Sequence, residues 1–229
     1  MREEKWIDFE KQARKQIREA CARLVFFRDG NLGDNPDPHR KILFILKMPN
    51  SSKGCQGCSE SCQYKDKPMI DNRKAPCGFH NRSREGDLWN RLFQIAKRLL
   101  KEDGDAVIDN SISIINLKKI GGGSTTASKL SMYSGSYEDH TEKLSDELKE
   151  QIAEISPEII FCCGTYGCVM KNLLLGETLE CVSSKEYISV HRSLDGKKVI
   201  VDAWHPTAPK LKNVENWKNY LCNVESIAF

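Results

Sequence analysis

The sequence predicts an α/β protein with three layers, in which helices cover both faces of a central, mainly parallel sheet of four to five strands. Short apolar runs, such as residues 41–47, alternate along the chain with longer amphipathic segments. Such runs are typical of strands buried on both faces, and their alternation with helices favours a parallel sheet. The chain has 229 residues, 39% of them hydrophobic, which is enough for one core. We therefore expect a single domain over residues 1–229.

Hydrophobic periodicity places the expected elements in order. An Asp195-Gly196 pair between two apolar stretches is typical of a hairpin turn. Cys162 and Cys163 lie in an apolar strand, where we expect them to be small core residues. The expected helices are 3–26, 86–101, 137–155 and 214–227; the expected strands are 41–47, 106–116 and 157–163, followed by a short helix that ends near residue 175 and by hairpin strands 187–192 and 197–203.

Charge and hydropathy exclude several classes of protein. The net charge is only +3, so the chain is not a histone-like polycation, although a local basic groove is compatible with it. No apolar run approaches the roughly 20 residues that span a bilayer. The first residues are charged and form no apolar signal segment. We expect a cytoplasmic monomer that makes no membrane contact.

A cysteine-rich stretch, residues 51–84, has no periodic pattern, and so long a loop needs something to organise it. Cys55-x2-Cys58 and Cys77-x2-His80 form two knuckles with the spacing of a zinc ribbon, which is the alternative we favour. Four cysteine thiolates could instead hold a [4Fe–4S] cluster. We therefore expect a metal-binding insertion that carries structural Zn²⁺ or a cluster, with ligands Cys55, Cys58, Cys62 and Cys77, and His80 as an alternative ligand.

Polar residues follow four of the expected strands. In a parallel sheet the carboxyl ends of the strands meet at one edge, where open α/β sheets bind their ligands. The chain has no Walker A motif and no dinucleotide-binding glycine fingerprint. The four strand ends are Lys47-Met48-Pro49-Asn50, Asn116-Leu117-Lys118, Gly164-Thr165-Tyr166-Gly167 and His205-Pro206-Thr207, and they predict a polar pocket.

The order of these motifs over roughly residues 40–220 resembles the uracil-DNA glycosylase superfamily. In that family a Pro-containing motif after the first strand forms the active-site loop, a later strand ends in Asn, and a C-terminal strand ends in His-Pro-Ser or His-Pro-Thr. The resemblance implies a DNA glycosylase that flips a pyrimidine out of DNA and hydrolyses its N-glycosidic bond, leaving an abasic site.

The resemblance also implies roles for individual residues. Asn116 would pair with the base edge, because an amide offers both a donor and an acceptor. His205 would stabilise the negative charge that develops on the departing base. Phe79 would stack on the base, beside Met48 and Pro49 of the active-site loop. The residues expected to contact the DNA backbone are Thr207, Lys118, Lys119, Lys129, Lys210 and Lys212.

The first motif departs from the family pattern. The family usually carries Asp, Asn or Glu just before the proline, whereas Lys47 and Met48 precede Pro49 here. Asn50 could replace the missing group from the other side of Pro49, and Lys47 could act as a nucleophile or as an electrostatic group. The departure would fit a modified or damaged pyrimidine as substrate, in DNA repair or in defence against phage. The alternative is a catalytically inactive DNA-binding module of the same fold.

Overall fold

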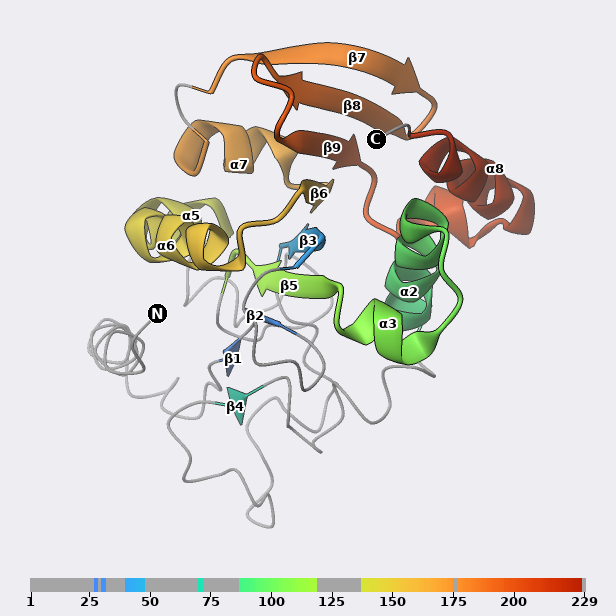
Figure 1. Cartoon of the computed structure of the whole chain (residues 1–229), viewed down its shortest axis with the longest axis horizontal. Helices are drawn as coiled ribbons and strands as arrows, with labels where there is room; N and C mark the ends of the chain where they lie inside the picture. The colour runs from blue at the N-terminus through green and yellow to red at the C-terminus, as the bar shows by residue number, and fades with distance from the viewer. Residues whose placement is uncertain are drawn as a thin grey trace.

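The computed structural model describes residues 27–28, 30–31, 40–47, 70–71, 87–118, 137–174 and 177–227 (Figure 1). The strands are β1 (Phe27–Arg28), β2 (Gly30–Asn31), β3 (Ile42–Leu46), β4 (Ile70–Asp71), β5 (Ile112–Asn116), β6 (Ile159–Cys163), β7 (Leu179–Lys185), β8 (Ile188–Ser193) and β9 (Val199–Ala203). The helices are α2 (Asp87–Leu100), α3 (Asp105–Asp109), α5 (Tyr137–Lys143), α6 (Ser145–Ile155), α7 (Tyr166–Asn172), the 3₁₀ turn η3 (Pro209–Lys212) and α8 (Val214–Glu225).

The described strands form a mixed sheet in the order β2-β5-β3-β6-β9-β8-β7, and β1 pairs separately with β4. The four central strands, β5, β3, β6 and β9, are parallel to one another. The flanking strands β2 and β8 run antiparallel to their central neighbours, and β7 pairs antiparallel with β8. The parallel centre agrees with the expected fold class, but the sheet is larger than the four to five strands expected.

Helices cover both faces of the sheet, which confirms three layers. In Figure 1, α5, α6 and α7 lie on one side, and α2, α3 and α8 lie on the other. Successive residues of β3 alternate between the two cores: Phe44 packs with the α2 and α8 side chains, and Ile45 packs with those of α6 and α7. This alternation follows from the two-residue period of a strand. It explains why residues 42–46 are all apolar and all buried.

Most of the expected elements are present among the described residues. The segments expected as strands at 41–47 and 157–163 contain β3 and β6, and the hairpin around Gly196 is formed by β8 and β9. Cys162 and Cys163 are fully buried, as expected. The helix expected over 137–155 is divided into α5 and α6 at the buried Leu144. The helix expected over 3–26 lies outside the described residues.

One prediction of secondary structure was wrong, and one strand was missed. Residues 106–116 were expected to form one strand, but α3 occupies the first half and only Ile112–Asn116 is extended. A short apolar run does not distinguish strand from helix; in α3 only Ile108 is buried, and Val107 is exposed. Strand β7 was not expected, because most of its residues are exposed at the sheet edge and lack an apolar pattern.

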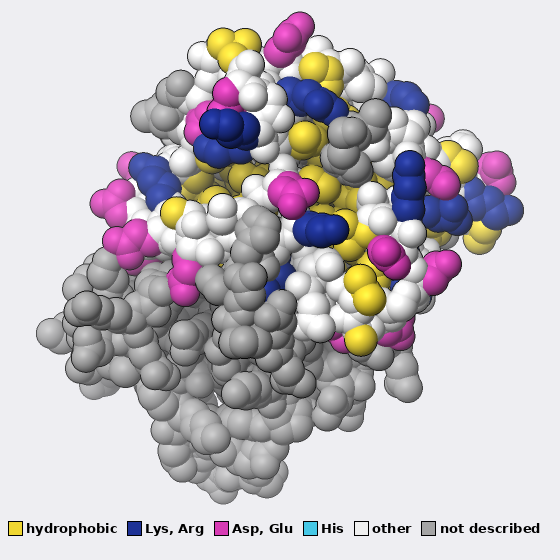
Figure 2. Space-filling view, viewed as in Figure 1, with side chains coloured by type: hydrophobic (Ala, Val, Ile, Leu, Met, Phe, Trp, Pro, Cys, Tyr) yellow, Lys and Arg dark blue, Asp and Glu magenta, His cyan; other side chains and the backbone are white. Residues whose placement is uncertain are grey.

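No helix among the described residues is long and apolar enough to cross a membrane. On the face shown in Figure 2, basic and acidic side chains of the described residues are interspersed. This distribution agrees with the small net charge of the chain.

Candidate active site at the carboxyl edge of the sheet

The strand order creates a switch point between β3 and β6. The chain passes from β3 to β5 on one side and then returns to β6 on the other side of β3. In open α/β sheets, ligands bind in the crevice beyond the carboxyl ends of the strands at such a point. Lys47 directly follows β3, and Gly164 directly follows β6. These two residues therefore mark the place where the topology favours a ligand.

Hydrogen bonds join the strand ends just beyond the sheet. The backbone N–H of Lys118 donates to the carbonyl of Lys47 at 2.9 Å, and that of Gly164 donates to the carbonyl of Ala203 at 2.7 Å. The Thr165 hydroxyl donates to the carbonyl of Ile45 at 3.0 Å. Side-chain and backbone bonds thus connect all four parallel strands at this edge, which gives the residues that follow them a fixed backbone.

Gly164 lies against both Lys47 and His205. Its φ of +69° lies in the left-handed region that favours glycine. A Cβ at this position would lie 3.7 Å from the Lys47 Cε and 3.7 Å from the His205 backbone nitrogen. The side chain of Lys47 and the backbone of His205 therefore both lie against this glycine, although the two residues are far apart in sequence.

His205 is held as a neutral imidazole. The Thr207 backbone N–H donates to Nδ1 of His205 at 3.3 Å, so Nδ1 is an acceptor and the neutral ring carries its proton on Nε2. Burial, and secondly the positive charge of Lys47, lower the pKa of His205 to about 4. At neutral pH the ring can therefore offer an Nε2–H to a ligand without carrying a charge of its own.

Lys47 lies between His205 and the first residue of α5. Its Nζ is 5.2 Å from the centre of the Tyr137 ring, which is the geometry of a cation–π contact. An ammonium group over an aromatic face is attracted by the ring quadrupole. This contact is compatible with the electrostatic role expected for Lys47. Burial raises the pKa of Tyr137, so this ring also stays neutral.

Asn116 and Lys118 lie at the same edge but are buried. Asn116 is the last residue of β5 and pairs in register with Leu46 of β3. Lys118 is 0% exposed, and burial lowers its pKa while Asp139 opposes that shift. The sequence predicted an exposed loop position for Lys118, from which it would contact the DNA backbone; the side chain instead lies in the interior, beside the start of α5.

The strand order also fixes the width of the site. Two strands, β3 and β6, lie between β5 and β9. Neighbouring strands are about 4.8 Å apart, so the backbones that carry Asn116 and His205 are separated by roughly 14 Å. The two side chains must therefore reach inward over β3 and β6 if both are to contact one base.

Several predicted site residues lie outside the described part of the chain, so their roles remain predictions. They are Met48, Pro49, Asn50, Phe79, Lys119 and Lys129, together with the metal ligands Cys55, Cys58, Cys62, Cys77 and His80. Among the residues that are described, no group of three or more His, Cys, Asp or Glu side chains could hold a metal ion.

Sequence reasoning missed two residues that support the site. Tyr137 was seen only as the start of a helix, and Arg91 only as part of an amphipathic one. Arg91 donates from Nη1 to the carbonyls of Pro206 at 2.7 Å and Leu211 at 2.8 Å, so it anchors the segment after His205 to α2. Neither residue belongs to a motif, and only the packing of helices against the sheet reveals their positions.

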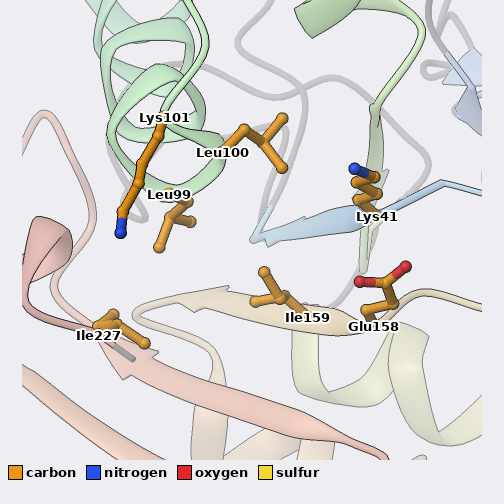
Figure 3. A pocket seen from close by; sticks show the side chains of 7 residues that line it. All are labelled: Lys41, Leu99, Leu100, Lys101, Glu158, Ile159 and Ile227. Atoms are coloured by element: carbon orange, nitrogen blue, oxygen red, sulfur yellow. The ribbon is translucent and has the colours of Figure 1, made fainter. Parts of the chain in front are cut away.

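A separate hollow lies at the opposite edge of the sheet. It has a volume of about 380 Å³, and Figure 3 shows that Lys41 and Glu158 line it, at the amino ends of β3 and β6. Leu99 and Ile227 contribute apolar surface from α2 and the C-terminal segment. It is distinct from the edge that carries His205.

Comparison of the sequence with protein-family models and with curated proteins finds no match.

Proposed function

We propose that this protein is a DNA glycosylase that hydrolyses the N-glycosidic bond of a flipped pyrimidine, either uracil or a modified or damaged base. The observation that carries the proposal is the neutral His205, with its proton on Nε2, beside the Lys47 side chain at the switch point of the sheet. The resemblance of the ordered strand-end motifs to the uracil-DNA glycosylase superfamily supports the same reaction. DNA is accordingly the proposed partner, and DNA repair or anti-phage defence the proposed setting.

These groups suit the chemistry of the bond. When the bond from the sugar C1′ to the base breaks, its electron pair stays on the base, while water supplies hydroxyl to C1′ and a proton to the base. A hydrogen bond from His205 Nε2–H to a base oxygen stabilises the developing anion. The Lys47 ammonium adds a positive charge in partly buried surroundings, where a charge acts more strongly than in water. A neutral donor beside a fixed cation is therefore suited to this step.

Asn116 and Asn50 complete the proposed site. Asn116 would bind the base edge from β5, and Asn50 would orient water in place of the group missing before Pro49. Zn²⁺, or alternatively a [4Fe–4S] cluster, would have a structural role in the 51–84 segment and no part in the bond cleavage.

The test is a mass-spectrometric screen for bases released from DNA that carries uracil and a panel of damaged or modified pyrimidines. For the best substrate, we expect His205→Ala to slow release by about 10²–10³-fold, the usual effect of removing one such donor. His191→Ala is the matched control, since His191 is also half-buried but lies on β8 and stacks on Tyr166. Release that is equally fast in the His205 variant would refute the proposed role.

A second candidate function is DNA binding without catalysis. It is favoured by the replacement of the usual polar residue before Pro49 by Lys47 and Met48. It predicts salt-dependent binding to DNA with no abasic product from any member of the panel.

A further inference from the structure

An exposed aromatic residue lies directly beside His205. Trp204 follows the last residue of β9, and 41% of its surface is exposed. Its backbone N–H donates to the carbonyl of Tyr187 at 3.0 Å, which joins the end of β9 to the turn between β7 and β8 (Figure 1). The other two tryptophans in the described part of the chain, Trp89 and Trp217, contribute to the core. Trp204 differs from them because its indole is exposed next to a polar site.

Aromatic and basic groups surround this indole. The Tyr187 ring meets it edge to face, with centroids 5.1 Å apart. The Nζ of Lys210 lies 5.4 Å from the centre of the Trp204 ring. Lys212 is exposed two residues further along η3. One carboxylate, Glu186, lies at the margin and interacts with the Tyr187 hydroxyl. We call Trp204, Tyr187, Lys210 and Lys212 the aromatic–basic surface.

The backbone under this surface is fixed. The Tyr220 hydroxyl donates to the carbonyl of Trp204 at 3.2 Å, and Nδ2 of Asn216 donates to the carbonyl of Lys210 at 2.9 Å. Arg91 binds the carbonyls of Pro206 and Leu211 in the same segment, and Leu211 is fully buried. Little conformational freedom remains to be lost in the backbone when a ligand binds here, which favours affinity.

We propose that the aromatic–basic surface binds a single-stranded stretch of DNA beside the base pocket. The inference rests on the proposed function, which places the flipped base beside His205. It concerns a different contact from those proposed for His205 and Asn116. Aromatic faces stack on any base, and neighbouring lysines neutralise phosphates, which is how single strands are bound without sequence preference. Lys210 can move from the indole to a phosphate, and an unpaired base then takes its place on the ring. Stacking of a base on the Trp204 ring is stronger than the cation–π contact of Lys210 with that ring.

The test measures binding of a short fluorescein-labelled oligothymidylate, which contains no substrate base, by fluorescence anisotropy. We expect Trp204→Ala to raise the Kd by about fivefold or more, the loss of one stacked base, and Trp204→Phe to retain most of the affinity. Lys210→Ala should lower the slope of log K against log salt by about 0.7. Lys197→Ala is the control, because Lys197 is an 82% exposed lysine beyond the opposite end of β9.

The outcomes separate this proposal from the glycosylase proposal. If binding weakens in Trp204→Ala but not in Lys197→Ala, the result supports single-strand binding by the aromatic–basic surface, whether or not any base is released in the separate screen. Unchanged affinity in Trp204→Ala, with an unchanged melting temperature, overturns it even if the protein proves to be a glycosylase. Equal affinity of the wild type for single-stranded and duplex DNA also overturns it, because stacking on Trp204 requires unpaired bases.

Discussion

Thr207 donates its backbone N–H to Nδ1 of His205, and its hydroxyl lies 2.9 Å from the same ring nitrogen. Two groups of one residue thus fix both the tautomer and the direction of the imidazole. The family resemblance assigned Thr207 to a DNA phosphate; the structure gives it a contact within the protein that serves His205.

Replacement of the Thr207 hydroxyl tests its contact with His205. Thr207→Val keeps the shape and the backbone N–H but removes the hydroxyl, and we expect base release to slow by about fivefold, the effect of one hydrogen bond of about 1 kcal/mol. Thr207→Ser restores the hydroxyl and should restore the rate. Nitrogen NMR shifts of the ring provide an independent measurement: the valine variant keeps the backbone N–H that donates to Nδ1, so it should keep the tautomer protonated on Nε2. A wild-type rate of base release in the valine variant would show that the hydroxyl does not support His205.

The lowered pKa of His205 predicts a loss of stability in mild acid. Burial and then Lys47 lower the folded-state pKa from 6.5 to about 4. The unfolded chain therefore takes up a proton near its ordinary pKa while the folded protein does not, so the free energy of unfolding falls as pH decreases from about 6.5 to about 4. The contribution of His205 approaches 1.4 kcal/mol per pH unit within that window. Urea unfolding at several pH values should show a shallower decline for His205→Gln.

Lys47→Met separates the two causes of that pKa. Removal of the ammonium should move the pKa of His205 only part of the way back toward 6.5, because burial is the larger cause. An NMR titration of the ring proton, assigned with His205→Gln, measures the shift. A value unchanged by Lys47→Met would mean that the two groups do not interact.

A pair of glycine variants separates backbone strain from an effect on the site. Gly164 and Gly196 have nearly the same φ, +69° and +71°, but a Cβ on Gly196 would have no neighbour within 4 Å. We expect Gly164→Ala and Gly196→Ala each to lower the free energy of unfolding by about 1–2 kcal/mol. Only Gly164→Ala should also lower base release, because its methyl group would lie against Lys47 and His205. Equal rates in the two variants would show that the edge tolerates the change.

Metal analysis of protein purified without air tests the cysteine prediction. A colourless protein with one zinc per chain agrees with a zinc ribbon, and a brown protein with iron agrees with a cluster. Cys58→Ser and Cys77→Ser should lose the metal and lower the melting temperature, because structural metals contribute directly to folding. Cys222→Ser, a change of an exposed cysteine in α8, should alter neither. Wild-type protein without either metal would refute the prediction.

The central strands could be predicted because a strand that is buried on both faces is apolar at every position. Residues 42–46 and 159–163 are apolar throughout, since each residue meets one core or the other. Strand β7 has no apolar pattern, because the side chains of this edge strand are mostly exposed. In α3 the run Ala106-Val107-Ile108 resembles a strand, but only Ile108 is buried.

The site could be predicted in part for a similar reason. The carboxyl-end rule correctly placed Lys47, Asn116, Gly164 and His205 at one edge. The protonation of His205 and the burial of Lys118 depend on what packs over that edge. The contributions of Tyr137 and Arg91 depend on the same packing. These contacts join residues far apart in the chain, and periodicity within one segment contains no information about them.

The register of the central sheet has a consequence for the order of folding. Ile42 pairs with Ile159, and Ile159 pairs in turn with Val199. The β3–β6 pairing closes a loop of more than a hundred residues, and topologies dominated by such distant contacts fold slowly. Until β6 has been synthesised, one edge of β3 has no partner strand, and its apolar side chains are open to aggregation. We therefore expect the His205 edge to be among the last parts of the protein to form during biosynthesis.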